Sequence, residues 1–449
     1  MADIASTTPA PAVESQAVGN VTFEQFEQVT AYSSLYGMAI LCLVVGSIRS
    51  VHFVQRHVTK KKFIETSLST REAKKFPFTA SFVLFGLYCF FNFNKVFAYV
   101  SAYLPVKVID IVNRLNSTAT PALNATELSQ NATGIKALVN KALVYMPVIN
   151  KANLLHFLLL LLCWEGCVAL AAILKPLFQF VLRRLPIGDR QPRVNIPYLF
   201  SLKSGKKEMD EGDIEDAKKD DTDYLMKIEF DSHDVICIAL CLSVGVSHLY
   251  QRHWITNNLL GIAFSIYGIE NLHLTSFKAG TWLLAGLFVY DVFWVFGTEV
   301  MTSVAKGIDA PILLQFPLDI YRNGWLDANK YAMLGLGDIV IPGIFVALLR
   351  RFDHRIGQKT NGKHQKGRYY FFITMFAYAL GLFVTMGVMH YFKAAQPALL
   401  YLVPSCILIP MILAVVRGEA RELWNYSEET FTESYQKKMK EQGSDKKKQ

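Results

Sequence analysis

Apolar runs alternate with short polar stretches along most of the chain, and each run is close to the ~20 residues that a helix needs to cross a bilayer. The plainest is LLHFLLLLLCWEGCVALAAIL, which begins at residue 154. The pattern predicts nine membrane-spanning helices, at residues 31–48, 77–98, 153–174, 233–250, 254–272, 281–304, 331–349, 370–391 and 396–416. The fourth and fifth are the weakest, because only QRHW separates them and Asn257 and Asn258 dilute the fifth. We therefore expect an all-α, polytopic membrane protein.

Composition and charge refine this picture. Hydrophobic residues make up 52% of the chain, charged residues 18%, and the net charge is +9. Lys and Arg gather in short stretches between apolar runs, which is how polytopic proteins are oriented, so we expect no nucleic-acid partner. Residues 1–30 contain no Lys or Arg, whereas residues 49–75 and 350–368 are strongly basic. The N-terminus is thus predicted to be lumenal and, with nine spans, the C-terminus cytosolic.

These assignments divide the chain into four parts. Residues 1–30 form a lumenal tail, residues 31–230 a three-span part, residues 231–417 a six-span part and residues 418–449 a cytosolic tail. The three-span part includes a lumenal loop at 99–152 and a cytosolic linker at 183–230. Within that linker, residues 204–223 are dense in charge and predicted to be disordered.

Glycosylation sequons agree with this orientation. Four N-x-S/T sequons fall on the predicted lumenal side and are expected to carry glycan: Asn20, Asn116, Asn124 and Asn131. A fifth, at Asn425, falls in the cytosolic tail and is expected to stay bare. The chain ends in KKKQ, where Lys446 and Lys447 resemble a dilysine retrieval signal of the endoplasmic reticulum. The alternative is a solvated basic tail.

The seven cysteines all lie in predicted spans, so no disulfide framework is expected. Cys163 with Cys167, and Cys237 with Cys241, have the i,i+4 spacing of one helix face. They are predicted to be packing residues, and a four-thiolate zinc site is the less common alternative. Glu165, in the middle of the third span, is interpreted as a protonated or locally paired residue, with a role near an internal cavity as the alternative.

Two acids lie deep in successive spans, and these carry the functional argument. Asp291 is in GLFVYDVFWVF and Asp338 is in YAMLGLGDIVIPGIF. Gly335, at i−3 on a helix, would share a face with Asp338, and Pro342, at i+4, has no N–H for the carbonyl of Asp338. Two neighbouring carboxylates share a proton and titrate as a pair, as they do in aspartic proteases.

The motifs YD (290–291), GLGD (335–338) and QPAL (396–399) together resemble the signatures of the intramembrane GxGD aspartyl proteases. Within that family the chain looks more like the signal peptide peptidases than the presenilins. The similarity is dense from about 233 to 416 and also covers the first two spans, but it thins over 100–230. The resemblance implies nine helices, a lumenal N-terminus and an endoplasmic reticulum membrane location.

Carried over residue by residue, the resemblance makes Asp291 and Asp338 the catalytic pair. It also implies that Tyr290, Gly335, Leu336 and Gly337 shape the approach to them, and that Pro397, Ala398 and Leu399 line the substrate side. The implied substrates are single-pass segments with a cytosolic N-terminus, including signal peptides left after signal peptidase cleavage. Lipid surrounds the enzyme, and a homo-oligomer and a membrane-protein degradation machinery are implied as further partners.

No motif for a metal or a nucleotide cofactor is found, so none is expected. Two alternatives to proteolysis remain open. A channel or transporter would use the same acids for ions or protons and would cut no peptide bond. A catalytically silent homologue would retain and escort membrane proteins, although the intact motifs argue against it.

Overall fold

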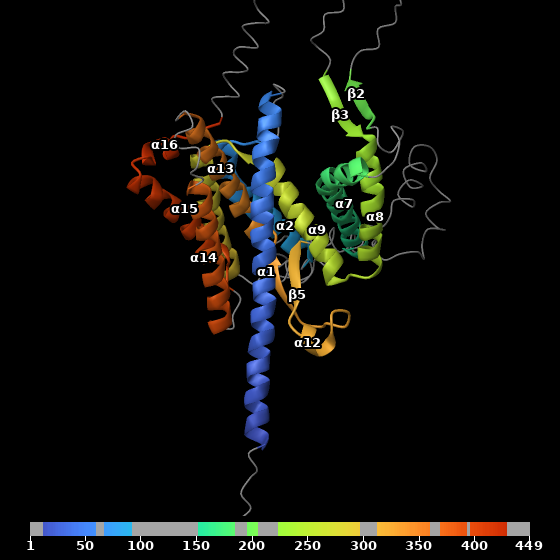
Figure 1. Cartoon of the computed structure of the whole chain (residues 1–449), viewed down its shortest axis with the longest axis vertical. Coiled ribbons are helices and arrows are strands. Elements are labelled where there is room, and N and C mark those ends of the chain that lie inside the picture. Colours follow the sequence, from blue (N-terminus) through green and yellow to red (C-terminus); the bar gives the residue numbers. More distant parts are fainter. Residues whose placement is uncertain are drawn as a thin grey trace, which may run out of the picture.

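The computed structural model describes residues 12–59, 67–91, 151–184, 195–204, 223–296, 312–359, 369–392 and 396–428 (Figure 1). Its helices are α1 (Ala12–Thr59), α2 (Thr70–Phe91), α7 (Lys151–Arg184), α8 (Ser232–Tyr250), α9 (Trp254–Asn271), α10 (Phe277–Phe296), α12 (Ile320–Asn323), α13 (Gly337–Lys359), α14 (Tyr369–Phe392), α15 (Leu399–Val416) and α16 (Ala420–Trp424). Its strands are β1 (Ser67–Leu68), β2 (Pro197–Ser204), β3 (Asp223–Asp231), β4 (His273–Leu274), β5 (Leu313–Pro317) and β6 (Tyr331–Gly335).

The structure supports a multi-pass helical membrane protein. Within the described ranges a helix lies in each of the nine predicted segments. Among the residues that the structure describes, five helices are long and apolar enough to cross a membrane: Gln25–His57, Leu155–Arg184, Ser232–Tyr250, Tyr369–Phe392 and Leu399–Val416. The total of nine crossings stays a prediction.

The all-α expectation is wrong in three places, where pairs of strands form. β1 pairs with β4 in parallel, whereas β2–β3 and β5–β6 are antiparallel hairpins. The error matters most at β6, because the run at 331–349 was predicted as one helix. Its first part is a strand, and an apolar run by itself does not separate the two structures.

Other boundaries also differ from the sequence-based ones. Helix α1 already begins at Ala12, so most of the expected tail at 1–30 is helical, and Asn20 lies within this helix. The linker at 183–230 contains most of the β2–β3 hairpin, while its residues 205–222 lie outside the described ranges. The sequons at Asn116, Asn124 and Asn131, and Lys446 and Lys447, also lie outside them.

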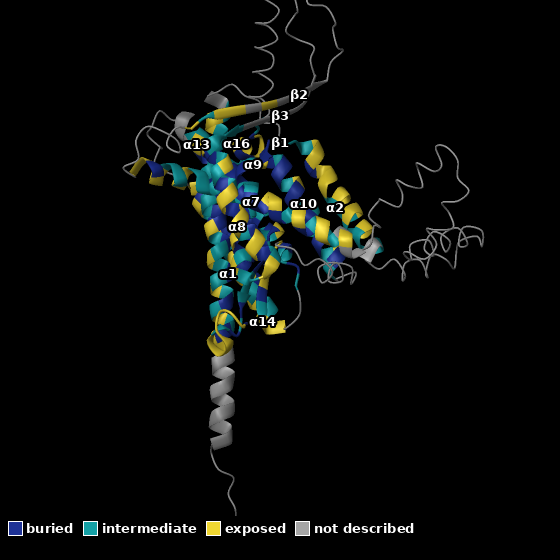
Figure 2. Ribbon diagram, turned by 90° about the vertical axis from the view of Figure 1, so that its right-hand side faces the viewer, coloured by how far each residue is buried: buried dark blue, intermediate teal, exposed yellow. Residues whose placement is uncertain are grey.

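Helix α1 runs through the centre of the molecule, between α13–α15 on one side and α7–α9 on the other (Figure 1). Small residues bring α1, α9 and α13 together around Ile269 of α9. A Cβ added at Gly46 would lie 2.8 Å from Cβ of Ile269, and one at Gly343 would lie 2.5 Å from its Cδ1. Such close backbone approach is typical of membrane helix interfaces. The interior is buried, while the outer helix faces expose large apolar side chains, as expected for contact with lipid (Figure 2).

The two ends of the bundle hold different loops. The hairpin end is the one with α12 and with β5, to which β6 is paired (Figure 1). The opposite end, the tail end, carries α16, β1 and the paired strands β2 and β3 (Figures 1 and 2). At the tail end the bridge between Ser276 and Ser427 ties the C-terminal segment to the start of α10. At the hairpin end Nε1 of Trp254 donates to the carbonyl of Trp325 at 2.9 Å. Each of these contacts joins loops that the charge pattern assigns to the same side of the membrane.

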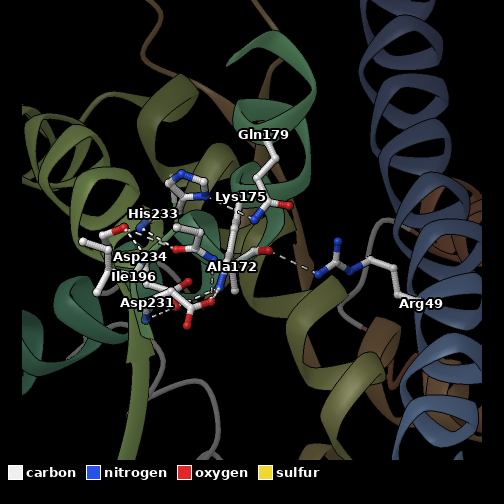
Figure 3. Close-up of polar contacts among 10 residues, drawn as sticks. Arg49, Ala172, Lys175, Gln179, Ile196, Asp231, His233 and Asp234 are labelled. Carbon is white, nitrogen blue, oxygen red and sulfur yellow. Dashed lines mark hydrogen bonds and ion pairs between the residues drawn. The ribbon is translucent and has the colours of Figure 1, made fainter. Parts of the chain in front are cut away.

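Charged contacts anchor α7 and α8 at the tail end (Figure 3). The ammonium of Lys175 on α7 lies 2.8 Å from a carboxylate oxygen of Asp231 and 2.8 Å from one of Asp234, at the start of α8. Arg49 of α1 donates to the carbonyl of Ala172 on α7 at 3.3 Å. The Lys175 pairs thus join α7 to α8, and the Arg49 contact joins α7 to the central helix α1.

Candidate active site

Asp291 and Asp338 come together although they belong to different elements. Asp291 lies in the second half of α10 and is 5% exposed, whereas Asp338 lies in the first turn of α13 and is half-buried. The two carboxylates are close enough to interact electrostatically. A helix N-terminus presents free N–H groups and the positive end of the helix dipole, so it is a favourable place for a carboxylate.

The start of α15 is the third element at the site, beside α10 and α13. The backbone N–H of Leu399 donates to Oδ2 of Asp291 at 3.2 Å. Leu399 is the first residue of α15, so its N–H has no partner within the helix. Ala398 is the N-cap and half-buried, and Pro397 before it is buried. The segment QPAL therefore supplies a hydrogen-bond donor to one of the two acids.

Gly335 lies against Asp338, but not in the way expected from the sequence. Because β6 ends at Gly335 and α13 begins at Gly337, the two residues do not share a helix face. A Cβ at Gly335 would lie 3.1 Å from Oδ2 of Asp338, whereas one at Gly337 would meet no atom within 4 Å. Leu336 is buried and points to α9, where its Cδ2 would lie 3.4 Å from a Cβ at Gly261. Leu336 is thus a packing residue.

Pro342 lies inside α13 and leaves the carbonyl of Asp338 without its helical donor. The hydroxyl of Tyr378 on α14 donates to that carbonyl at 3.3 Å. Tyr378 is fully buried, so its hydroxyl is held at this position by the surrounding core. The proline indicated that the Asp338 carbonyl needs another donor, but not that Tyr378 would supply it.

The remaining expected residues have other surroundings. The ring of Tyr290 packs against Trp294, one turn later on α10, and Trp294 also contacts Leu84, Leu87 and Tyr88 of α2. Tyr290 therefore packs beside the residue that joins α10 to α2.

The further acids of the spans lie away from the pair. Glu165 is on an exposed face of α7. Glu270 of α9 is buried, and Arg49 of α1 pairs with it at 2.6 Å.

The cysteines of α7 and α8 pack together. Cys167, Cys237 and Cys241 form a small buried cluster with Ala171 and Leu260. Among the described residues no group of three or more His, Cys, Asp and Glu side chains is placed to hold a metal ion.

Sequence reasoning missed two asparagines near the site. Asn257 and Asn258 of α9 are each 5% exposed and bind the backbone of β5. The available signal was that two consecutive amides in a membrane span are costly unless they have partners.

Known proteins resemble the chain over most of its length. A family model described as signal peptide peptidase matches residues 59–430. The chain is 50% identical to Intramembrane protease 2 of Caenorhabditis elegans, over 98% of each chain. It is 38% identical to the signal peptide peptidase of Homo sapiens, over 89% of this chain and 83% of that protein. No solved structure matches.

The family match covers both acids, the start of α15 and every described helix except α1. The family resemblance inferred from the three motifs is confirmed, and the chain belongs to the signal peptide peptidase family of intramembrane proteases.

Proposed function

We propose that this protein is an aspartyl protease that hydrolyses peptide bonds within membrane-spanning segments, with Asp291 and Asp338 as its catalytic pair. The observation that carries the proposal is the approach of these two carboxylates at the start of α13, beside the backbone N–H of Leu399 that donates to Asp291. A pair of neighbouring carboxylates that holds one proton is the working state of an aspartic protease.

The pair supplies both of the groups that hydrolysis needs. One ionised carboxylate takes a proton from water as the water oxygen attacks the scissile carbonyl carbon. The protonated partner gives its proton to the carbonyl oxygen, which yields a tetrahedral diol. When the C–N bond breaks, the leaving nitrogen receives a proton from the pair and the new carboxyl group departs.

The hydrogen bond from Leu399 suggests how the roles divide. An N–H that donates to a carboxylate stabilises its negative charge. Asp291 accepts such a bond, whereas no hydrogen bond to the Asp338 side chain is found among the described residues. We therefore assign the ionised state that activates water to Asp291 and the shared proton to Asp338.

A substrate helix must unwind before its carbonyl can be attacked, and β6 offers a place for the unwound segment. Only β5 pairs with β6 in the described structure, and β6 ends three residues before Asp338. A substrate strand added to β6 would keep its backbone hydrogen bonds satisfied inside the membrane. The open space at Gly337 leaves room for such a strand beside Asp338.

The family and the charge pattern support a proposal for the substrate class and the location. We propose signal peptides and other single-pass segments with a cytosolic N-terminus as substrates, in the endoplasmic reticulum membrane. The contacts between loops of the same predicted side support the alternating topology that this assignment needs. A further supporting contact joins Arg322 of the 305–330 loop to Glu27 at 3.3 Å.

Cleavage of a synthetic signal peptide by the purified full-length protein in detergent tests the proposal, with fragments identified by mass spectrometry. Asp291→Asn and Asp338→Asn should each lower the single-turnover rate by at least ~10³-fold, and the double variant should be no worse, because the pair acts as one unit. The matched control is Asp327→Asn in the exposed loop before β6, which should cut like wild type. The pH–rate profile should be bell-shaped.

Retained cleavage in a folded Asp338→Asn variant would exclude the pair. If no peptide is cut by wild type and ion flux depends on both acids, the channel or transporter alternative replaces this proposal.

A further inference from the structure

The β5–β6 hairpin has two outer edges, and α9 covers one of them. Nδ2 of Asn257 donates to the carbonyl of Leu313 at 2.7 Å. Nδ2 of Asn258 donates to the carbonyl of Gln315 at 2.6 Å, and its Oδ1 accepts from the N–H of Gln315 at 2.8 Å. The amide of Asn258 thus binds both backbone groups of Gln315, as a residue of a neighbouring strand would.

The helix fits closely to this edge. A Cβ at Gly261, one turn after Asn257, would lie 3.0 Å from Cδ2 of Leu314, so a side chain at this position would force Leu314 to shift. Both asparagine side chains are buried. Buried amides are costly in a membrane unless they are hydrogen-bonded, and here the described partners are backbone groups of β5.

The strand register shows what the opposite edge presents. Gln315 is paired with Met333, and Leu313 with Gly335. In an antiparallel pair, opposite residues direct their N–H and C=O groups either both toward each other or both away. Because Gln315 and Leu313 bind α9, the backbone groups of Met333 and Gly335 face the open side of β6. Gly335 is also the residue that lies against the Asp338 carboxylate.

We propose that Asn257 and Asn258 are positioning residues that close the β5 edge, so that a substrate strand adds only along Met333 and Gly335 of β6. This inference rests on the proposed proteolysis, since it concerns how the substrate reaches the acids. An unpaired edge recruits any extended segment, and a substrate bound along β5 would have β6 between it and Asp338. Closing that edge therefore leaves one productive strand position.

Capture of an uncut substrate tests the edge directly. The full-length Asp338→Asn protein receives one added cysteine, by Met333→Cys or by Gln315→Cys. Each protein is incubated with a transmembrane peptide that bears a bromoacetyl group. The Asp338→Asn protein without an added cysteine measures the background reaction of the native cysteines. We expect capture at Met333→Cys at least ~10-fold above that at Gln315→Cys. Adding Asn257→Leu and Asn258→Leu should bring the two captures within about twofold.

Cleavage gives a second reading that is sensitive to register. With Asp338 intact, the Asn257→Leu, Asn258→Leu double variant should lose about tenfold in kcat/KM and should cut the peptide at additional positions, because three backbone hydrogen bonds are lost. Asn271→Leu is the matched control: it lies on the same helix, and its Nδ2 bonds to the carbonyl of Tyr267 within α9. That variant should keep the wild-type fragment pattern.

The single variant Asn258→Leu provides a milder version if the double variant does not fold. It loses the two hydrogen bonds to Gln315 and keeps the one from Asn257 to Leu313, so its effects should be intermediate. The inference would be overturned if both cysteines captured the peptide equally while Asn257 and Asn258 are in place. It would also be overturned if replacing the two asparagines changed neither the capture nor the fragments. If the proposed proteolysis is wrong, wild type cuts nothing, yet the capture contrast still reports whether α9 closes the edge.

Discussion

Removing the hydroxyl of Tyr378 isolates a single contact to the backbone of Asp338. Tyr378→Phe keeps the ring in its fully buried site and removes only the donor that lies 3.3 Å from the Asp338 carbonyl. Pro342 has no N–H, so the helix does not replace this donor. The first turn of α13 should then shift, and the Asp338 carboxylate with it.

The expected magnitude follows from the geometry. A hydroxyl–carbonyl bond is usually ~2.7–2.8 Å long, so this contact of 3.3 Å is at the weak end. A typical hydrogen bond contributes ~0.5–1.5 kcal/mol, and leaving a buried carbonyl unsatisfied costs ~1–3 kcal/mol. Because Asp338 is half-buried, water can replace part of the lost contact. We take a loss of ~1 kcal/mol, which corresponds to a factor of about five in rate.

The assay is steady-state cleavage of a synthetic signal peptide by the purified protein in detergent. We expect kcat to fall about fivefold at nearly constant KM, because the contact orients a reacting group and touches no substrate. Tyr391→Phe is the matched control, since Tyr391 is on the same helix and is 81% exposed. A folded Tyr378→Phe protein with the kcat of wild type, or an equal fall in Tyr391→Phe, would refute the reasoning.

Three further predictions concern the site, the loops and the topology. Gly335→Ala should lower the cleavage rate at least ~10-fold, because its Cβ would crowd the carboxylate of Asp338 at 3.1 Å, whereas Gly86→Ala, in open space on α2, should leave the rate unchanged. Burial lowers the pKa of His273 to about 3, so between pH 6.5 and 3 the unfolded state binds a proton that the folded state does not. Thermal unfolding should accordingly show wild type losing ~2 kcal/mol from pH 7.5 to 5 and His273→Gln losing less, and equal pH slopes would contradict this. Glycosidase digestion should reduce the apparent mass of the protein by removing glycans from the three sequons of the loop at 99–152. A glycan on the C-terminal tail would instead contradict the predicted topology.

Several properties were determined by the sequence itself, because they depend on neighbouring residues. Apolar run length located a helix in each of the nine predicted segments, and the three motifs identified the family from a few positions each. The missing N–H of Pro342 showed that the Asp338 carbonyl has no donor in its own helix. These signals are local, and tertiary contacts do not change them.

The tertiary structure decided which distant groups meet. Whether 331–335 is a strand depends on its pairing with β5, and the apolar run there fits a helix equally well. In the sequence Asn257 and Asn258 are two polar residues that weaken a predicted membrane span, and only the structure shows that they bind the backbone of β5. The contact of the Leu399 N–H with Asp291 likewise needs α10 and α15 side by side. Each contact joins groups far apart in the chain, and only packing of the whole bundle brings such groups within hydrogen-bond distance.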